Sequence, residues 1–337
     1  MDYIYFFIVN ILLISSINYI QYKFNFLLDI KLKHKIKIKE KIPLSGGIYI
    51  LVSIITCKLF YDIDISTNLL IILFLFFVLG FFSDTKPNFI PILRLLIQLI
   101  LILLLIYICN LEIDKSNIFF IDRFLSNYYF NILFTSICII VLLNGSNFID
   151  GVNTNLIGYC LIILLFVSEL NYFININFII ITLAVFYIFN FFGKCFLGDN
   201  GVYVISILLS FIVINIINYN NLNPIIAINL LWYPAFENLF SIIRRYISSD
   251  KVDIADKKHL HSLLFLILNK KKYLTKYSNS LSGLFINIYN FVSLGLSYKY
   301  LNNNQILICI LVINITLYLF TYFKLLNILS NRVVSKK

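Results

Sequence analysis

Residues 91–111 read PILRLLIQLILILLLIYICNL, an apolar run interrupted only by Arg94, Gln98 and Asn110 near its two ends. An α-helix of about 20 mostly apolar residues crosses the hydrocarbon core of a bilayer, because each residue rises about 1.5 Å. Comparable segments recur along the whole chain. Together they predict about eleven transmembrane helices, at residues 2–22, 44–60, 67–83, 91–111, 129–145, 154–170, 174–193, 201–218, 223–243, 280–299 and 305–326.

The composition of the whole chain supports the same fold class. Of the 337 residues, 61% are hydrophobic and 13% are charged, and the mean hydropathy is +0.92. A soluble domain of this length would expose large apolar patches, whereas lipid solvates apolar side chains directly. Strands of a membrane barrel would be shorter and would alternate polar and apolar residues. We therefore expect an all-α polytopic membrane protein with a single domain over residues 1–337.

The basic residues predict the orientation of these helices. The net charge of +11 comes from Lys and Arg beside apolar runs, which is typical of loops at the membrane surface and not of a nucleic-acid-binding face. With the N-terminus outside and the C-terminus in the cytoplasm, the basic segments 23–41, 244–276 and 332–337 all fall inside. The loops 61–64, 168–171 and 219–221, which contain no Lys or Arg, then fall outside. The first span carries no basic residue before Lys23 and is therefore expected to remain as a span, not to be cleaved as a signal peptide.

Five polar segments lie near the ends of the predicted spans, and this orientation puts all five on the cytoplasmic face. They are Lys41–Gly47, Gly80–Asp84, Asn144–Asn153, Phe196–Gly201 and Arg244–His261. Each alone has a structural interpretation, such as a helix cap at Gly198–Asp199 or a turn at Pro43–Gly47. Carboxylates at span ends are costly, however, and Mg²⁺ prefers one or two carboxylates together with phosphate oxygens. The joint pattern therefore predicts a Mg²⁺-assisted reaction on a phosphorylated cytosolic substrate.

These segments, in this order, resemble those of the polyprenyl-phosphate N-acetylhexosamine-1-phosphate transferases (glycosyltransferase family 4). The resemblance extends from about Ile42 to Leu264, and Asn147-Phe-Ile-Asp150-Gly151 with Phe196-Leu-Gly198-Asp199 carry most of its specificity. The histidine segment ending at His261 resembles the branch of undecaprenyl-phosphate GlcNAc-1-phosphate transferases. It differs from that of the phospho-MurNAc-pentapeptide translocases.

The resemblance implies an enzyme that transfers a HexNAc 1-phosphate from a UDP-sugar to undecaprenyl phosphate, releasing UMP, to initiate a surface polysaccharide. It implies Mg²⁺, with Mn²⁺ as an alternative, and a place in the bacterial inner membrane with the active site facing the cytoplasm. A homodimer is compatible with it. The implied metal ligands are Asp199 and Asp84. The implied catalytic residues are Asp84, Asp150, Asp199, His259 and His261, and the implied substrate-binding residues are Lys41, Asn147, Gly151, Asn153, Arg244 and Arg245.

Three positions depart from the family pattern. Ser83 replaces the first aspartate of an Asp-Asp pair, Thr154 stands where glycine is common, and Glu237 stands where aspartate is frequent. The missing aspartate has been proposed as a base toward the lipid phosphate. Since a phosphate monoester has a second pKa near 6, much of it is already a dianion at neutral pH, and such a base could be dispensable.

The sequence leaves other functions open. A translocase of peptidoglycan synthesis belongs to the same class. A membrane transporter would instead carry charges at mid-span and paired broken helices. A catalytically inactive homologue is the third alternative, raised by Ser83. Neither the sugar nor the polysaccharide pathway follows from these motifs.

Overall fold

A computed structural model describes residues 2–32, 39–61, 65–86, 89–170, 175–248, 258–270 and 274–334. Asp256 and parts of the basic loops lie outside these ranges. The helices are α1 (Asp2–Phe24), α2 (Gly46–Phe60), α3 (Thr67–Thr85), α4 (Pro91–Cys109), α5 (Phe119–Leu125), α6 (Tyr128–Ile149), α7 (Asn155–Ser168), α8 (Ile176–Phe191), α9 (Gly198–Tyr219), α10 (Ile225–Leu230), α11 (Trp232–Ser248), α12 (Leu260–Leu268), α13 (Ser278–Lys299) and α14 (Asn304–Val334). Two strands, β1 (Leu28–Leu32) and β2 (Lys39–Pro43), complete the described elements.

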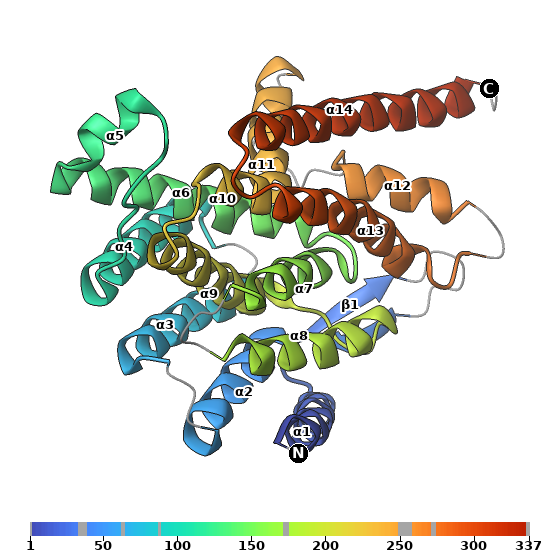
Figure 1. Cartoon of the computed structure of the whole chain (residues 1–337). Coiled ribbons are helices and arrows are strands. Elements are labelled where there is room, and N and C mark those ends of the chain that lie inside the picture. The colour runs from blue at the N-terminus through green and yellow to red at the C-terminus, as the bar shows by residue number, and fades with distance from the viewer. Residues whose placement is uncertain are drawn as a thin grey trace.

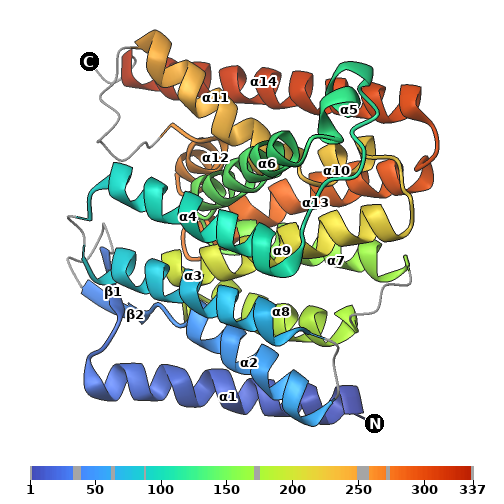
Figure 2. The ribbon, with the colours of Figure 1, turned by 90° about the vertical axis from the view of Figure 1, so that its left-hand side faces the viewer.

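The apolar helices form one bundle in which most helices run side by side (Figures 1 and 2). Within the described residues, seven helices are long and apolar enough to cross a membrane: α1, α3, α4, α6, α9, α13 and α14. The apolar helices α2, α7 and α8 are shorter. The chain is therefore a helical multi-pass membrane protein, as predicted. The number eleven and the orientation stay predictions.

Helix α9 lies at the centre of the bundle and is the most buried of the seven long helices. It packs against α2, α3 and α6, and its buried face consists mainly of Val, Ile and Leu, with Ser206 and Ser210 bonded back to their own helix. The contact with α3 is close at Gly80, where an added Cβ would come within 2.5 Å of the Asn200 Cα. The start of α9, which contains Asp199, is thus fixed from several sides.

The basic segment after α1 forms an antiparallel hairpin, which the all-α prediction did not include. Strands β1 and β2 pair from Leu28 opposite Pro43 to Leu32 opposite Lys39. Strand β1 (Leu-Asp-Ile-Lys-Leu) alternates apolar and charged residues, the period of a half-buried strand, whereas β2 (Lys-Glu-Lys-Ile-Pro) does not. The predominance of lysine concealed this pattern. The hairpin lies at the end of the bundle opposite to the start of α1 (Figure 2).

The span predicted at 223–243 is divided into α10 and α11, which meet at Leu231. Pro234 has no N–H to donate to the Leu230 carbonyl four residues earlier, and its ring would clash with that carbonyl. The Tyr159 hydroxyl donates to the Leu230 oxygen instead, at 2.7 Å. This tyrosine, buried in α7, stabilises the break from outside the helix. The short helices α5 and α12 were also not predicted.

Candidate active site

Four of the five predicted polar segments contribute to one cavity of about 480 Å³ at one end of the bundle. Its walls come from the end of α3, the end of α6, the loop before α7 and the start of α9. Two of the segments also pair directly, because the Phe196 N–H donates to the Pro43 oxygen at 2.8 Å. Of the predicted site residues, six line the cavity: Asp84, Asn147, Asp150, Gly151, Asn153 and Asp199.

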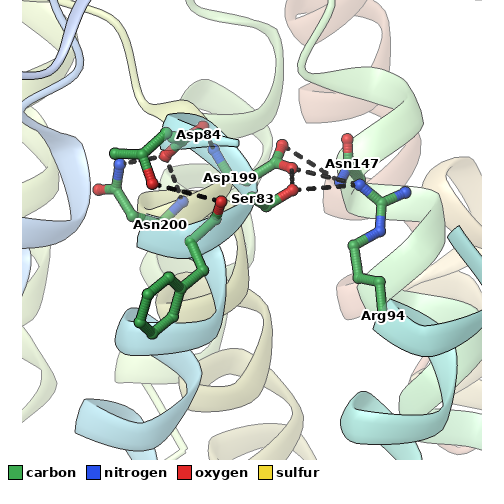
Figure 3. Close-up of polar contacts among 8 residues, drawn as sticks. Ser83, Asp84, Arg94, Asn147, Asp199 and Asn200 are labelled. Carbon is green, nitrogen blue, oxygen red and sulfur yellow. Dashed lines mark hydrogen bonds and ion pairs between the residues drawn. The ribbon is translucent and has the colours of Figure 1, made fainter. Parts of the chain in front are cut away.

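Asp84 holds the first turn of α9. Its Oδ1 accepts from the Asp199 N–H at 2.9 Å and its Oδ2 from the Asn200 N–H at 3.0 Å, and the Asn200 side-chain amide donates to Oδ2 as well (Figure 3). The first N–H groups of a helix have no partner within it and carry partial positive charge, so a carboxylate there is favourable. Gly198, at φ +70°, makes the turn possible, and a Cβ at this position would meet Asp84 Oδ2 at 2.9 Å. Asp84 therefore positions Asp199.

Asp199 faces the cavity with side-chain donors on both carboxylate oxygens. The Ser83 hydroxyl donates to Oδ2 at 2.5 Å, Arg94 Nη1 lies 3.4 Å from the same oxygen, and the Asn147 amide lies 3.4 Å from Oδ1 (Figure 3). Ser83 therefore contributes a donor at the position where an aspartate would add a second negative charge beside Asp199.

These side chains fit a Mg²⁺ ion that is completed by substrate. Among the described residues, no group of three or more His, Cys, Asp or Glu could enclose a metal ion by itself. Mg²⁺ in phosphate-transferring sites usually takes one or two carboxylates and fills its shell with phosphate oxygens and water. Asp199 is the better ligand of the two predicted, since the one contact that its Oδ1 accepts from the described residues is the long one from Asn147. The oxygens of Asp84 already accept three hydrogen bonds.

Asp150 lies just past the end of α6 and completes a group of three carboxylates around the cavity. Burial, together with the carboxylates of Asp199 and Asp84, raises the pKa of Asp150 well above its ordinary value. Such a group gives up its proton more readily when a cation arrives, because the cation offsets the repulsion. This is a second feature that fits a divalent ion in the cavity.

The far wall of the cavity is made of asparagines. The Asn153 N–H donates to Asn279 Oδ1 at 3.0 Å, and the Asn153 amide donates to the Asn190 carbonyl at 2.8 Å. Asn190 Oδ1 in turn accepts from the Thr154 N–H at 2.6 Å. Thr154 adopts φ +69°, a left-handed conformation that favours glycine, and its hydroxyl bonds the Asn153 and Ser280 carbonyls. The glycine that the resemblance implies at this position would adopt this conformation without strain.

The predicted histidines lie behind this cavity and do not line it. His259 and His261 are buried, with parallel rings whose centroids are 5.4 Å apart. His259 Nδ1 lies 2.9 Å from Oε1 of buried Glu237, and the Tyr318 hydroxyl of α14 donates to Oε2 at 2.7 Å. A Cβ on Gly151 would come within 2.1 Å of His261 Nε2, so the cavity wall rests directly on that imidazole.

The three predicted basic residues lie outside the cavity lining. Lys41 is exposed in β2, and its Nζ donates to Asn25 Oδ1 at 2.7 Å. The Arg244 guanidinium lies about 6 Å from the centres of two aromatic rings, those of Phe240 and Tyr322. Arg245 lies over the Phe148 ring at 5.8 Å. A role for any of them in substrate binding stays a prediction.

Several residues of the site were not predicted. Asn279 and Asn190 line the cavity, Asn200 links Asp84 to the Gly47 N–H, and Tyr318 bonds Glu237. Asn190 and Asn279 lie 37 and 126 positions from Asn153, their partner in the cavity wall, in a chain rich in asparagine. Arg94, which contacts Asp199, could have been identified from the sequence, since it is a charge within an apolar span.

Comparison with known proteins agrees with this geometry. Residues 66–217 match the sequence model of Glycosyl transferase family 4. A protein of Bacillus subtilis (strain 168), described as a probable undecaprenyl-phosphate N-acetylglucosaminyl 1-phosphate transferase, is 27% identical over 245 residues. That similarity covers 68% of this chain and 67% of the relative. The matched region contains Ser83, Asp84, Asp150 and Asp199. Both matches confirm the resemblance to glycosyl transferase family 4 that the polar segments predicted, over the part of the chain that they cover.

Proposed function

We propose that this protein transfers a HexNAc 1-phosphate from a UDP-sugar to undecaprenyl phosphate, with release of UMP. One observation carries the proposal: three carboxylates and an asparagine wall share a polar cavity at one end of a lipid-embedded helical bundle. Such a site suits a water-soluble phosphorylated donor and an acceptor that stays in the bilayer. The printed function of the Bacillus relative supports the same reaction.

In the proposed reaction an oxygen of the lipid phosphate attacks the β-phosphorus of the UDP-sugar. A phosphorus–oxygen bond forms to the acceptor, the bond between the two donor phosphates breaks, and UMP leaves. A bound Mg²⁺ would offset charge on the diphosphate and the leaving UMP. Asp199 would hold that ion, and Asp84 would fix the backbone of Asp199. Asn147 would restrain Oδ1 of Asp199.

Ser83 is compatible with this reaction because the acceptor needs little help to ionise. A phosphate monoester has a second pKa of about 6, so the attacking oxygen is largely deprotonated at neutral pH. Ser83 would instead act on Asp199, whose Oδ2 it restrains. The main task of the cavity would therefore be to offset the charge of the donor and acceptor phosphates and to align them.

The proposed location is the bacterial inner membrane, with the cavity on the cytoplasmic side. The basic segments 23–41 and 244–276 support this orientation through the positive-inside rule. UDP-sugars are cytosolic, so the donor would meet the site on that side. The product, a polyprenyl diphosphate sugar, would prime a surface polysaccharide.

The test is release of UMP by membranes that contain the protein, supplied with polyprenyl phosphate, Mg²⁺ and a panel of UDP-sugars. We expect UMP release from at least one UDP-HexNAc, loss of release with EDTA, and loss in Asp199→Asn at unchanged protein level. Cys309→Ser, an exposed position in α14, serves as the matched control. Absence of UMP release from every UDP-HexNAc would refute the proposed function.

A further inference from the structure

Arg94 touches the cavity wall from outside. Its Nη1 lies 3.4 Å from Asp199 Oδ2 and 3.3 Å from Ser83 Oγ, and these two residues line the cavity while Arg94 itself does not (Figure 3). A guanidinium has five N–H donors in a planar fork. The described contacts of Arg94 to side chains use Nη1 only, which leaves the donors on Nη2 and Nε for another acceptor.

The surroundings of Arg94 belong to the membrane-facing surface. It lies in the first turn of α4, and the apolar side chains around it and further along the helix are exposed: Ile90, Ile92, Leu93, Leu96, Ile100 and Leu103. Most of α4 is likewise not covered by the rest of the protein, since only 22% of its apolar window is buried. Arginine at the end of a span lies at the depth of lipid phosphate groups. Arg94 thus stands between lipid and the carboxylate of Asp199.

The ion pair between Arg94 and Asp199 is open to exchange. Their side chains are 32% and 25% exposed, and ion pairs of this exposure contribute little to stability because water screens them. A phosphate monoester carries up to two negative charges and three acceptor oxygens. It matches the guanidinium fork in a bidentate manner, which a carboxylate contact through one nitrogen does not use.

We propose that Arg94 binds the phosphate of the isoprenoid acceptor, which reaches Asp199 and Ser83 laterally from the bilayer along α4. This inference rests on the proposed transfer reaction. The donor would occupy the cavity, and the acceptor phosphate would approach the same carboxylate from the opposite, lipid-facing side. Arg94 would leave Asp199 Oδ2 as it takes the phosphate, so that acceptor binding removes a competing cation from the carboxylate proposed to bind the metal.

The inference is tested with Arg94→Gln and Arg94→Lys in detergent-solubilised full-length protein. We expect KM for polyprenyl phosphate to rise roughly 10- to 100-fold in Arg94→Gln, and less in Arg94→Lys, with KM for the UDP-sugar unchanged. Calorimetric titration with farnesyl phosphate, without any UDP-sugar, should show a similar weakening. Mn²⁺ affinity, measured by electron paramagnetic resonance, should increase about two- to fivefold in Arg94→Gln because a competing cation is removed.

Lys86→Gln is the matched control, since Lys86 is an exposed cation at the end of α3 that lies over the Phe82 ring. An unchanged acceptor KM in Arg94→Gln overturns the inference, as does a rise in the donor KM alone, which would assign Arg94 to the donor diphosphate. If Arg94→Gln does not fold, Arg94→Lys decides by the same criteria. Farnesyl phosphate binding that depends on Arg94, in a protein that releases no UMP, would refute the proposed function and leave this inference standing.

Discussion

Replacing Asp84 with asparagine separates two roles of this carboxylate, the support of α9 and the binding of metal. Asp84 accepts the backbone N–H groups of Asp199 at 2.9 Å and Asn200 at 3.0 Å, one on each oxygen. Asparagine keeps one carbonyl oxygen and turns the other acceptor into an NH₂ group that faces a donor. We expect Asp84→Asn to lose one of these bonds and to loosen the first turn of α9.

The size of the effect follows from these contacts. Losing one hydrogen bond between a backbone N–H and a charged group costs about 1.5 to 3 kcal/mol, and we expect the lower end, about 1.5 to 2 kcal/mol, because Asp84 is only half-buried. An unfolding entropy of about 2.1 cal/mol/K per residue gives about 0.7 kcal/mol/K for 337 residues. The expected decrease in Tm is therefore about 2 to 3 °C.

The assay is thermal unfolding of purified protein in detergent, together with Mn²⁺ binding. Thr85→Val is the control, because the Thr85 hydroxyl bonds the carbonyls of its own helix at Phe81 and Phe82 and no other side chain or carbonyl in the described part of the chain. We expect a lower Tm in Asp84→Asn with Mn²⁺ affinity largely retained through Asp199. An unchanged Tm combined with loss of Mn²⁺ binding would show that Asp84 is a metal ligand and that the capping argument is wrong.

Three further outcomes are expected. Gly151→Ala should lower activity at least tenfold and lower the free energy of unfolding by about 1 to 3 kcal/mol, because its Cβ would meet His261 Nε2 at 2.1 Å. Gly295→Ala is the control and should leave activity unchanged, since the nearest atom to its Cβ is at 3.4 Å. Equal activity of the two variants would contradict the packing argument. The raised pKa of Asp150 means that the folded protein holds this proton more tightly than the unfolded chain, so metal-free stability should decrease as pH rises from about 4 toward the raised value. If the Tm of Asp150→Asn depends on pH in the same way as the Tm of the unaltered protein, Asp150 is not the cause of that dependence. Tyr318→Phe removes the hydroxyl that donates to a buried carboxylate and should cost about 1 to 3 kcal/mol in thermal unfolding; an unchanged Tm would contradict a stabilising role for this bond.

The residues that the sequence placed in the site were those that break a strong pattern. Asp84, Asp150 and Asp199 stand out because a charge at the end of an apolar span is rare and costly. The structure brings all three to one cavity. Asn190 and Asn279 could not be identified in the same way, because asparagine is frequent throughout the chain and carries no charge to set it apart.

The histidines show where residue type alone fails to predict a position in the site. Their residue type suggested direct contact with substrate, yet His259 and His261 are buried behind Phe148 and Gly151. Sequence spacing cannot tell which face of a short helix such as α12 points to a cavity, because the connections before and after it set its rotation. The partner of His259, Glu237 in α11, lies 22 positions away and meets it only in the tertiary fold.

By itself, the sequence determined that this protein is a bundle of membrane helices and which polar segments were candidates for its site, because apolar length and rare charges are local properties. The tertiary structure alone decided how the polar groups divide their tasks. Asp84 became the support of α9, Asp199 the carboxylate that faces the cavity, and Arg94 the cation on its lipid side. The physical reason is that hydrogen bonds and ion pairs act over about 3 Å. Asp84 and Arg94 lie more than 100 positions from Asp199, and the packing of α3, α4 and α9 brings them close to it.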